Sequence, residues 1–209
     1  MTLGAVGRMS QDIRICFVGD SFVNGTGDRT YLGWTGRLCK GLAEQGKAVT
    51  HYNLGVRRDT SVDIWKRWEG ETAHRFLHGC DNRVVFCFGT NDTTWENGQQ
   101  RVYSIDSHRH CRRILTTASK RYPVLMISPP PIADSKQNAL TEKLCEDFWL
   151  TCWELKIPYL DIFTPLSQSK SWYEAVKAGD GSHPGAGGYA EIADIIQEWS
   201  VWQHWFAAS

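Results

Sequence analysis

The sequence predicts an α/β protein with a five-stranded parallel sheet covered by helices on both faces, a three-layer α/β/α doubly wound arrangement. Two observations predict it. Five short apolar segments rich in β-formers alternate with longer segments of helical period, which is typical of parallel β/α/β units. The 209 residues contain no repeat, linker or low-complexity tract, so we expect one domain over 1–209, with 1–12 as a flexible N-terminal segment.

Each expected element has a local sequence signal. The first strand is a continuous apolar run, as expected for a strand covered on both faces. The first helix carries Trp34, Leu38 and Leu42 on one face, and Pro184 suits the first position of the last helix. The expected strands are 13–18, 48–54, 83–88, 124–127 and 159–162, and the expected helices are 31–45, one that begins at Thr60 or Ser61 and extends to Leu77, 104–120, 139–155 and 184–199.

Polar or glycine residues follow the first three strands. The first strand ends at Gly19 and delivers Ser21, followed by a glycine-containing loop over 22–28; Gly55 ends the second strand and Asn91 follows the third. The carboxyl ends of parallel strands form the ligand crevice of such a sheet. We therefore expect these three residues to meet at one edge.

A serine hydroxyl becomes a nucleophile when a base removes its proton. Far downstream, Asp180 precedes His183 by three residues, just ahead of the last helix. His183 could accept the Ser21 proton through one ring nitrogen while Asp180 fixes the tautomer through the other. The sequence therefore offers Ser21, His183 and Asp180 as nucleophile, base and orienting carboxylate for ester hydrolysis through an acyl-enzyme.

The oxyanion that forms on attack needs hydrogen-bond donors. The backbone N–H groups of Ser21 and Gly55 and the side-chain amide of Asn91 are suitable. Asp20 and Asp92 are assigned supporting parts. Each residue also has a simpler structural reading, since serine, aspartate and asparagine cap helices and turns, a glycine can serve a turn, and a histidine can cap a helix. Their joint occurrence at strand ends favours catalysis.

In this order, the residues resemble the SGNH, or GDSL-type, esterase and lipase family. Its first block appears as Gly19-Asp20-Ser21-Phe22, its second is centred on Gly55, its third is Gly89-Thr90-Asn91-Asp92, and its last is Asp180-Gly181-Ser182-His183-Pro184. The blocks run through nearly the whole chain. Phe22 replaces the usual leucine, and a single glycine defines the second block.

The resemblance implies a five-stranded flavodoxin-like sheet. It also implies that Ser21 is the nucleophile, that Gly55 and Asn91 complete the oxyanion hole, and that His183 and Asp180 act as base and orienting group. The α/β-hydrolase elbow Gly-x-Ser-x-Gly is a poorer match, because Val23 occupies the position of its second glycine.

Two other classes of function remain open from the sequence. Asp20, Asp92, Asp180 and His183 could ligate a divalent metal for phosphoester hydrolysis. A non-catalytic module could instead bind a ligand through the strand-end loops of a flavodoxin-like fold, although the loop over 24–27 lacks the glycine pattern and lysine of a phosphate cradle.

Composition narrows the partners. The 23 basic residues balance the 23 acidic residues, so nothing favours nucleic acid or an anionic membrane, and we expect a small-molecule ester substrate and no cofactor. The seven cysteines lack CxxC pairs and no segment is long and apolar enough to span a bilayer, which predicts a cytoplasmic protein. The acyl chain and the alcohol portion stay open, since acyl or acetyl esters of small molecules, lipids and sugars all fit. The choice between ester and thioester, the oligomeric state and the role of the tryptophan-rich C-terminus stay open as well.

Overall fold

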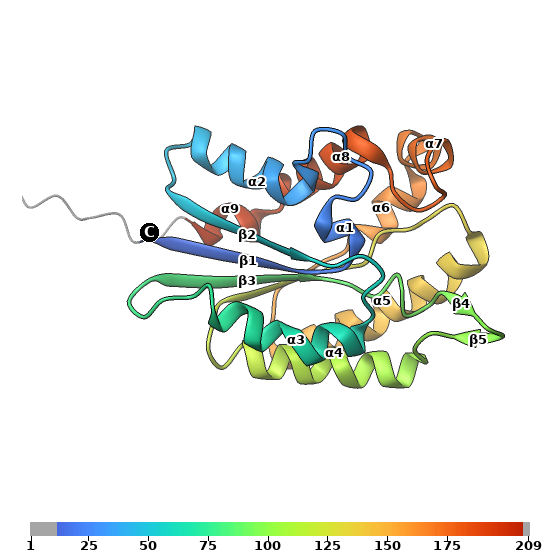
Figure 1. Ribbon diagram of the computed structural model, residues 1–209, viewed down its shortest axis with the longest axis horizontal. Helices are drawn as coiled ribbons and strands as arrows, with labels where there is room; N and C mark the ends of the chain where they lie inside the picture. Colours follow the sequence, from blue (N-terminus) through green and yellow to red (C-terminus); the bar gives the residue numbers. More distant parts are fainter. Residues whose placement is uncertain (1–11, 207–209) are drawn as a thin grey trace, which may run out of the picture.

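The computed structural model describes residues 12–206 and has the expected parallel sheet at its centre (Figure 1). The five strands lie in the order β2-β1-β3-β6-β7, and every neighbouring pair is parallel. With the small β4–β5 hairpin set aside, this is the 2-1-3-4-5 order of flavodoxin-like sheets. The strands are β1 (Ile13–Gly19), β2 (Val49–Gly55), β3 (Asp81–Cys87), β6 (Val124–Ile127) and β7 (Tyr159–Leu160).

Helices cover both faces of the sheet (Figure 1). Alternate side chains of β1 enter two separate cores, with Ile15 and Phe17 in one and Cys16 and Val18 in the other, as the two-residue period of a strand requires. The first core lies under α2 (Gly33–Glu44), α8 (Gly185–Glu198) and α9 (Ser200–Trp205), and the second lies under α3 (Ser61–Ala73), α4 (Ser104–Ala118) and α5 (Ser135–Leu155).

The three-layer prediction is thus confirmed, and the differences concern short elements. The predicted loop over 22–28 begins instead as the one-turn helix α1 (Ser21–Asn24). Five further short elements were not predicted, because two to nine residues give too little periodicity to detect: β4 (Trp95–Glu96), β5 (Gln99–Gln100), α6 (Phe163–Gln168), α7 (Lys170–Ala178) and α9 (Ser200–Trp205).

The aromatic C-terminus packs back onto the sheet. Trp202 and Phe206 are buried in the first core, and the Arg83 guanidinium lies over the rings of Trp205 and Phe206. Within 12–206, none of the helices has the length and apolar character that a bilayer crossing requires. The predicted flexible segment over 1–12 lies, apart from Asp12, outside the described residues.

Candidate active site

Ser21 is the first residue of α1, directly after the end of β1. The Asp20 carboxylate caps this helix by accepting a hydrogen bond from the Phe22 N–H at 2.9 Å, and Gly25 ends the turn in a left-handed conformation with φ of 80°. Ser21 is 6% exposed, and neither its hydroxyl nor its N–H is hydrogen-bonded to another residue of the described chain. The strand therefore delivers a nearly buried but unengaged hydroxyl at a helix N-terminus.

Gly55 lets α1 lie directly on the end of β2. A Cβ atom at Gly55 would lie 2.1 Å from the Asn24 backbone nitrogen, so any side chain there would displace the helix. Asn53 strengthens the contact by donating to the Val23 carbonyl at 2.7 Å. The Gly55 N–H donates to Asn53 Oδ1 at 2.9 Å. The visible role of Gly55 is thus close packing, with its N–H already engaged by a side chain.

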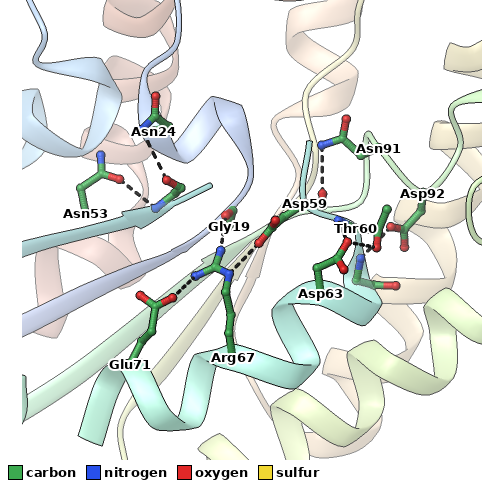
Figure 2. A network of polar contacts seen from close by, with 12 residues as sticks. Gly19, Asn24, Asn53, Asp59, Thr60, Asp63, Arg67, Glu71, Asn91 and Asp92 are labelled. Carbon is green, nitrogen blue, oxygen red and sulfur yellow. Dashed lines mark hydrogen bonds and ion pairs between the residues drawn. The ribbon is translucent and has the colours of Figure 1, made fainter. Parts of the chain in front are cut away.

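Asn91 reaches the loop that follows β2. Its side-chain Nδ2 donates to the Asp59 carbonyl at 2.9 Å (Figure 2), which uses one of its two N–H groups and leaves the other for a ligand. In the same loop Arg58 has a left-handed backbone with φ of 69°, and its guanidinium pairs with Glu96 of β4 at 2.9 Å. No sequence pattern points to Arg58 or Asp59, because their roles depend on the backbone geometry of this loop.

Asp180 and His183 form a pair on the turn between α7 and α8. His183 Nδ1 and Asp180 Oδ2 are 2.7 Å apart, and Asp180 Oδ1 accepts the backbone N–H groups of Ser182 at 3.0 Å and His183 at 2.9 Å. Partial burial alone would raise the pKa of Asp180, but the hydrogen bonds from His183 and Ser182 lower this pKa to about 2. Asp180 is therefore an ionised partner that favours the tautomer with a proton on Nδ1.

The His183 ring lies against the element that carries Ser21. Its centroid is 5.2 Å from that of Phe22, and a Cβ atom at Gly27 would lie 3.4 Å from the His183 Cβ. Tyr189 of α8 donates to the Thr26 carbonyl at 2.8 Å and ties the two segments together. The structure thus brings the turn and α1 side by side.

Ser21 and His183 lie close to each other without a hydrogen bond between their side chains. His183 Nε2 is buried and has no hydrogen-bond partner among the described residues, Ser21 included. A catalytic hydrogen bond of this kind often forms fully only with substrate in place. An unpartnered buried ring nitrogen is costly, so its retention here favours a role toward a ligand.

Asp20 and Asp92 are both buried and each has one unpartnered carboxylate oxygen. Burial, helped by the nearby Asp92 and Asp59 charges, raises the pKa of Asp20 to about 7, despite the hydrogen bond from Phe22. Burial likewise raises the pKa of Asp92, whose Oδ1 accepts the Ser61 N–H at 2.7 Å. Each carboxylate therefore holds the first turn of a helix.

The residues of the metal alternative do not gather into a ligand set. Across 12–206, no group of three or more His, Cys, Asp and Glu side chains could hold a metal ion. A second serine–histidine pair exists, in which Ser61 Oγ and His110 Nδ1 are 3.1 Å apart. Ser61 is completely buried, so substrate has no access to that hydroxyl.

Comparisons with known proteins agree with this geometry. Residues 17–191 match the model of the GDSL-like lipase/acylhydrolase family, and the chain belongs to this family. The protein is therefore a carboxylic ester hydrolase of the esterase and lipase class. None of the curated proteins compared with the chain matches it.

Solved structures share the fold at low sequence identity. A lipase/acylhydrolase from Enterococcus faecalis is 20% identical with a TM-score of 0.72, covering 88% of this chain and 93% of its own. A G-D-S-L family protein from Veillonella parvula is 18% identical with a TM-score of 0.71, over 90% and 98% of the two chains. A catalytic mutant of an acetylxylan esterase from Geobacillus stearothermophilus is 15% identical with a TM-score of 0.71, over 90% and 94%.

Proposed function

We propose that the protein hydrolyses small carboxylic esters through an acyl-enzyme on Ser21. The observation that carries this proposal is the 2.7 Å Asp180–His183 pair, whose free Nε2 is buried against the helix that begins with Ser21. His183 takes the Ser21 proton as the hydroxyl attacks the ester carbonyl, then donates it to the departing alcohol. Water activated by His183 releases the acid and restores the serine.

The oxyanion is held by the Ser21 N–H and the second N–H of the Asn91 amide. This assignment is supported because both N–H groups lack another acceptor. Asn91 uses only one of its two amide N–H groups to bind the Asp59 carbonyl, so the second is available. Gly55, the third proposed donor, must release Asn53 Oδ1 or share its hydrogen with the oxyanion. Loss of one such donor typically slows acyl transfer by about 10²- to 10³-fold.

The substrate class follows from charge and chemistry. Balanced charge gives no field for nucleic acid or an anionic membrane, so the proposed partner is a neutral small-molecule ester, such as a short acyl ester or an acetylated sugar. All seven cysteines are free thiols, which supports the proposal that the protein works in the reducing cytoplasm.

Covalent labelling with a fluorophosphonate tests the nucleophile. We expect one adduct per chain, located on Ser21 by peptide mass spectrometry and absent from Ser21→Ala. The labelled protein should lose p-nitrophenyl acetate turnover in proportion to the adduct. A tag on another serine, or full turnover by folded Ser21→Ala, would overturn the mechanism.

A further inference from the structure

Arg67 of α3 is a largely buried cation whose side chain is 18% exposed. It makes three hydrogen bonds with three different partners (Figure 2). Nε donates to Asp59 Oδ2 at 2.6 Å, Nη1 donates to Glu71 Oε1 at 3.0 Å, and Nη2 donates to the Gly19 carbonyl at 2.8 Å. Glu71 lies on the same helix, whereas Gly19 and Asp59 lie in other segments.

The two distant partners belong to the two segments that carry the site. Gly19 ends β1 and lies two residues before Ser21. Asp59 presents its side chain to Arg67 and its backbone carbonyl to the Asn91 amide. One guanidinium therefore joins the strand end that delivers the nucleophile to the loop that orients the amide.

The strand end beneath Arg67 is also fixed by packing. A Cβ atom at Gly19 would lie 2.0 Å from the Cys87 carbonyl oxygen, and the Gly19 carbonyl accepts a second hydrogen bond, from the Val56 N–H at 3.0 Å. Gly19 thus provides a rigid reference point. The loop over 56–59 is held to it by Val56 at one end and, through Arg67, by Asp59 at the other.

Stability alone gives no strong reason for this arrangement. Replacing a buried ion pair by well-packed apolar residues is often neutral or stabilising. Arginine does offer a planar donor set with fixed directions, which lysine cannot reproduce. Such a group suits the task of holding two segments at a set distance.

We propose that Arg67 is a positioning residue for the oxyanion hole, an inference that rests on the proposed function. It holds Asp59 against the end of β1 and thereby aims the Asn91 amide at the carbonyl that Ser21 attacks. Arg67 itself does not touch the substrate. Misplacement of a group by about 1 Å can cost on the order of 10²-fold in rate.

The test compares Arg67→Gln with wild type by kcat and KM for p-nitrophenyl acetate. Because the oxyanion forms in the transition state, we expect kcat to fall by about 10- to 100-fold and KM to change by less than about 3-fold. Arg67→Lys keeps the charge and guards against a folding defect, so it should recover part of kcat. Melting curves establish that each variant is folded.

Arg75→Gln is the matched control. Arg75 also contacts Glu71, because Arg75 Nη1 donates to the Glu71 backbone carbonyl at 2.6 Å. Within the described chain, Arg75 bonds to neither Gly19 nor Asp59. Its removal should leave kcat within about 2-fold of wild type, since it lacks the link to Asn91. An equal loss of kcat in both variants would assign the effect to general destabilisation and refute positioning.

A double-mutant cycle with Asn91→Ala separates positioning from a merely structural role. If Arg67 acts through Asn91, then Arg67→Gln should lower kcat by less than about 3-fold once Asn91 is alanine. Multiplicative losses, or full kcat in Arg67→Gln, would overturn the inference. The rate of Ser21 labelling by fluorophosphonate gives the same cycle without an ester. If Ser21 of wild type is labelled but the protein hydrolyses no ester, the proposed function fails, and the labelling rates of the four proteins in the cycle still test the role of Arg67.

Discussion

The two sides of the candidate site are built by contacts of very different range. The strand-end side comprises α1, the loop over 55–60 and Asn91, and the hydrogen bonds that join it to other segments link residues 30 to 48 positions apart in sequence. The turn side comprises Asp180–His183, where the hydrogen bonds of the Asp180 carboxylate link residues two or three positions apart. The proposed nucleophile and oxyanion donors are thus placed by contacts across the sheet, whereas the pairing of Asp180 with the proposed base is set within one turn.

The largest effect should come from the turn side. His183→Ala removes the proposed base, so we expect kcat/KM for p-nitrophenyl acetate to fall by at least about 10³-fold. Because the hydrogen bonds between Asp180 and His183 are local, the melting temperature of the protein should change by only a few degrees. Asp180→Asn should lower activity without abolishing it, since the oxyanion donors remain. Wild-type activity in folded His183→Ala would contradict the assigned base.

The same contrast explains what the sequence could predict. Asp180 and His183 are three residues apart, so a local motif sufficed to pair them. Ser21 and Asn91 were found because strand ends converge at one edge of a parallel sheet. Gly55 was predicted as an oxyanion donor, a role that stays a proposal because its N–H bonds to Asn53. Arg67 gave no signal, since two of its partners become neighbours only in the folded sheet.

Regular alternation of strands and helices likewise predicted the layers and the sheet. It missed α1, because one helical turn has no detectable period. The Asp20 cap and the bare Gly55 surface define that turn. The parts of the fold that could not be predicted are therefore those that shape the site most closely.

Gly55→Ala tests how much the strand-end side depends on close packing. The new Cβ must displace Asn24 and α1, so we expect a loss of about 1–3 kcal/mol in the free energy of unfolding and a fall in kcat. Gly70→Ala is the control, because Gly70 is exposed within α3 and a Cβ there meets nothing within 4 Å. It should stabilise the protein by about 0.5–1 kcal/mol. Equal unfolding curves for the two variants would argue against this packing role.

The last expected effect concerns Asp20 and is an effect on stability alone, which distinguishes the two sides by their dependence on pH. Burial raises the pKa of Asp20 to about 7 from its ordinary 3.8, so between these values the folded protein holds a proton that the unfolded chain has lost. Its contribution to stability therefore falls as the pH rises through this window. Asp180 has a pKa lowered to about 2, so its own contribution is lost at lower pH, as the pH falls below about 4.

Asp20→Asn removes the ionisation while keeping an oxygen for the Phe22 N–H. The free energy of unfolding of this variant, relative to wild type, should therefore increase from pH 5 to pH 8 by roughly 2–3 kcal/mol. Urea unfolding at both pH values measures the difference. Asp180→Asn serves as the comparison, because the Asp180 carboxylate that it removes is ionised throughout this pH range in wild type. A parallel pH dependence in Asp20→Asn and wild type would mean that Asp20 is ionised beside Ser21. The proposed nucleophile would then lie next to a fixed negative charge, and the proposed oxyanion donors would have to offset it.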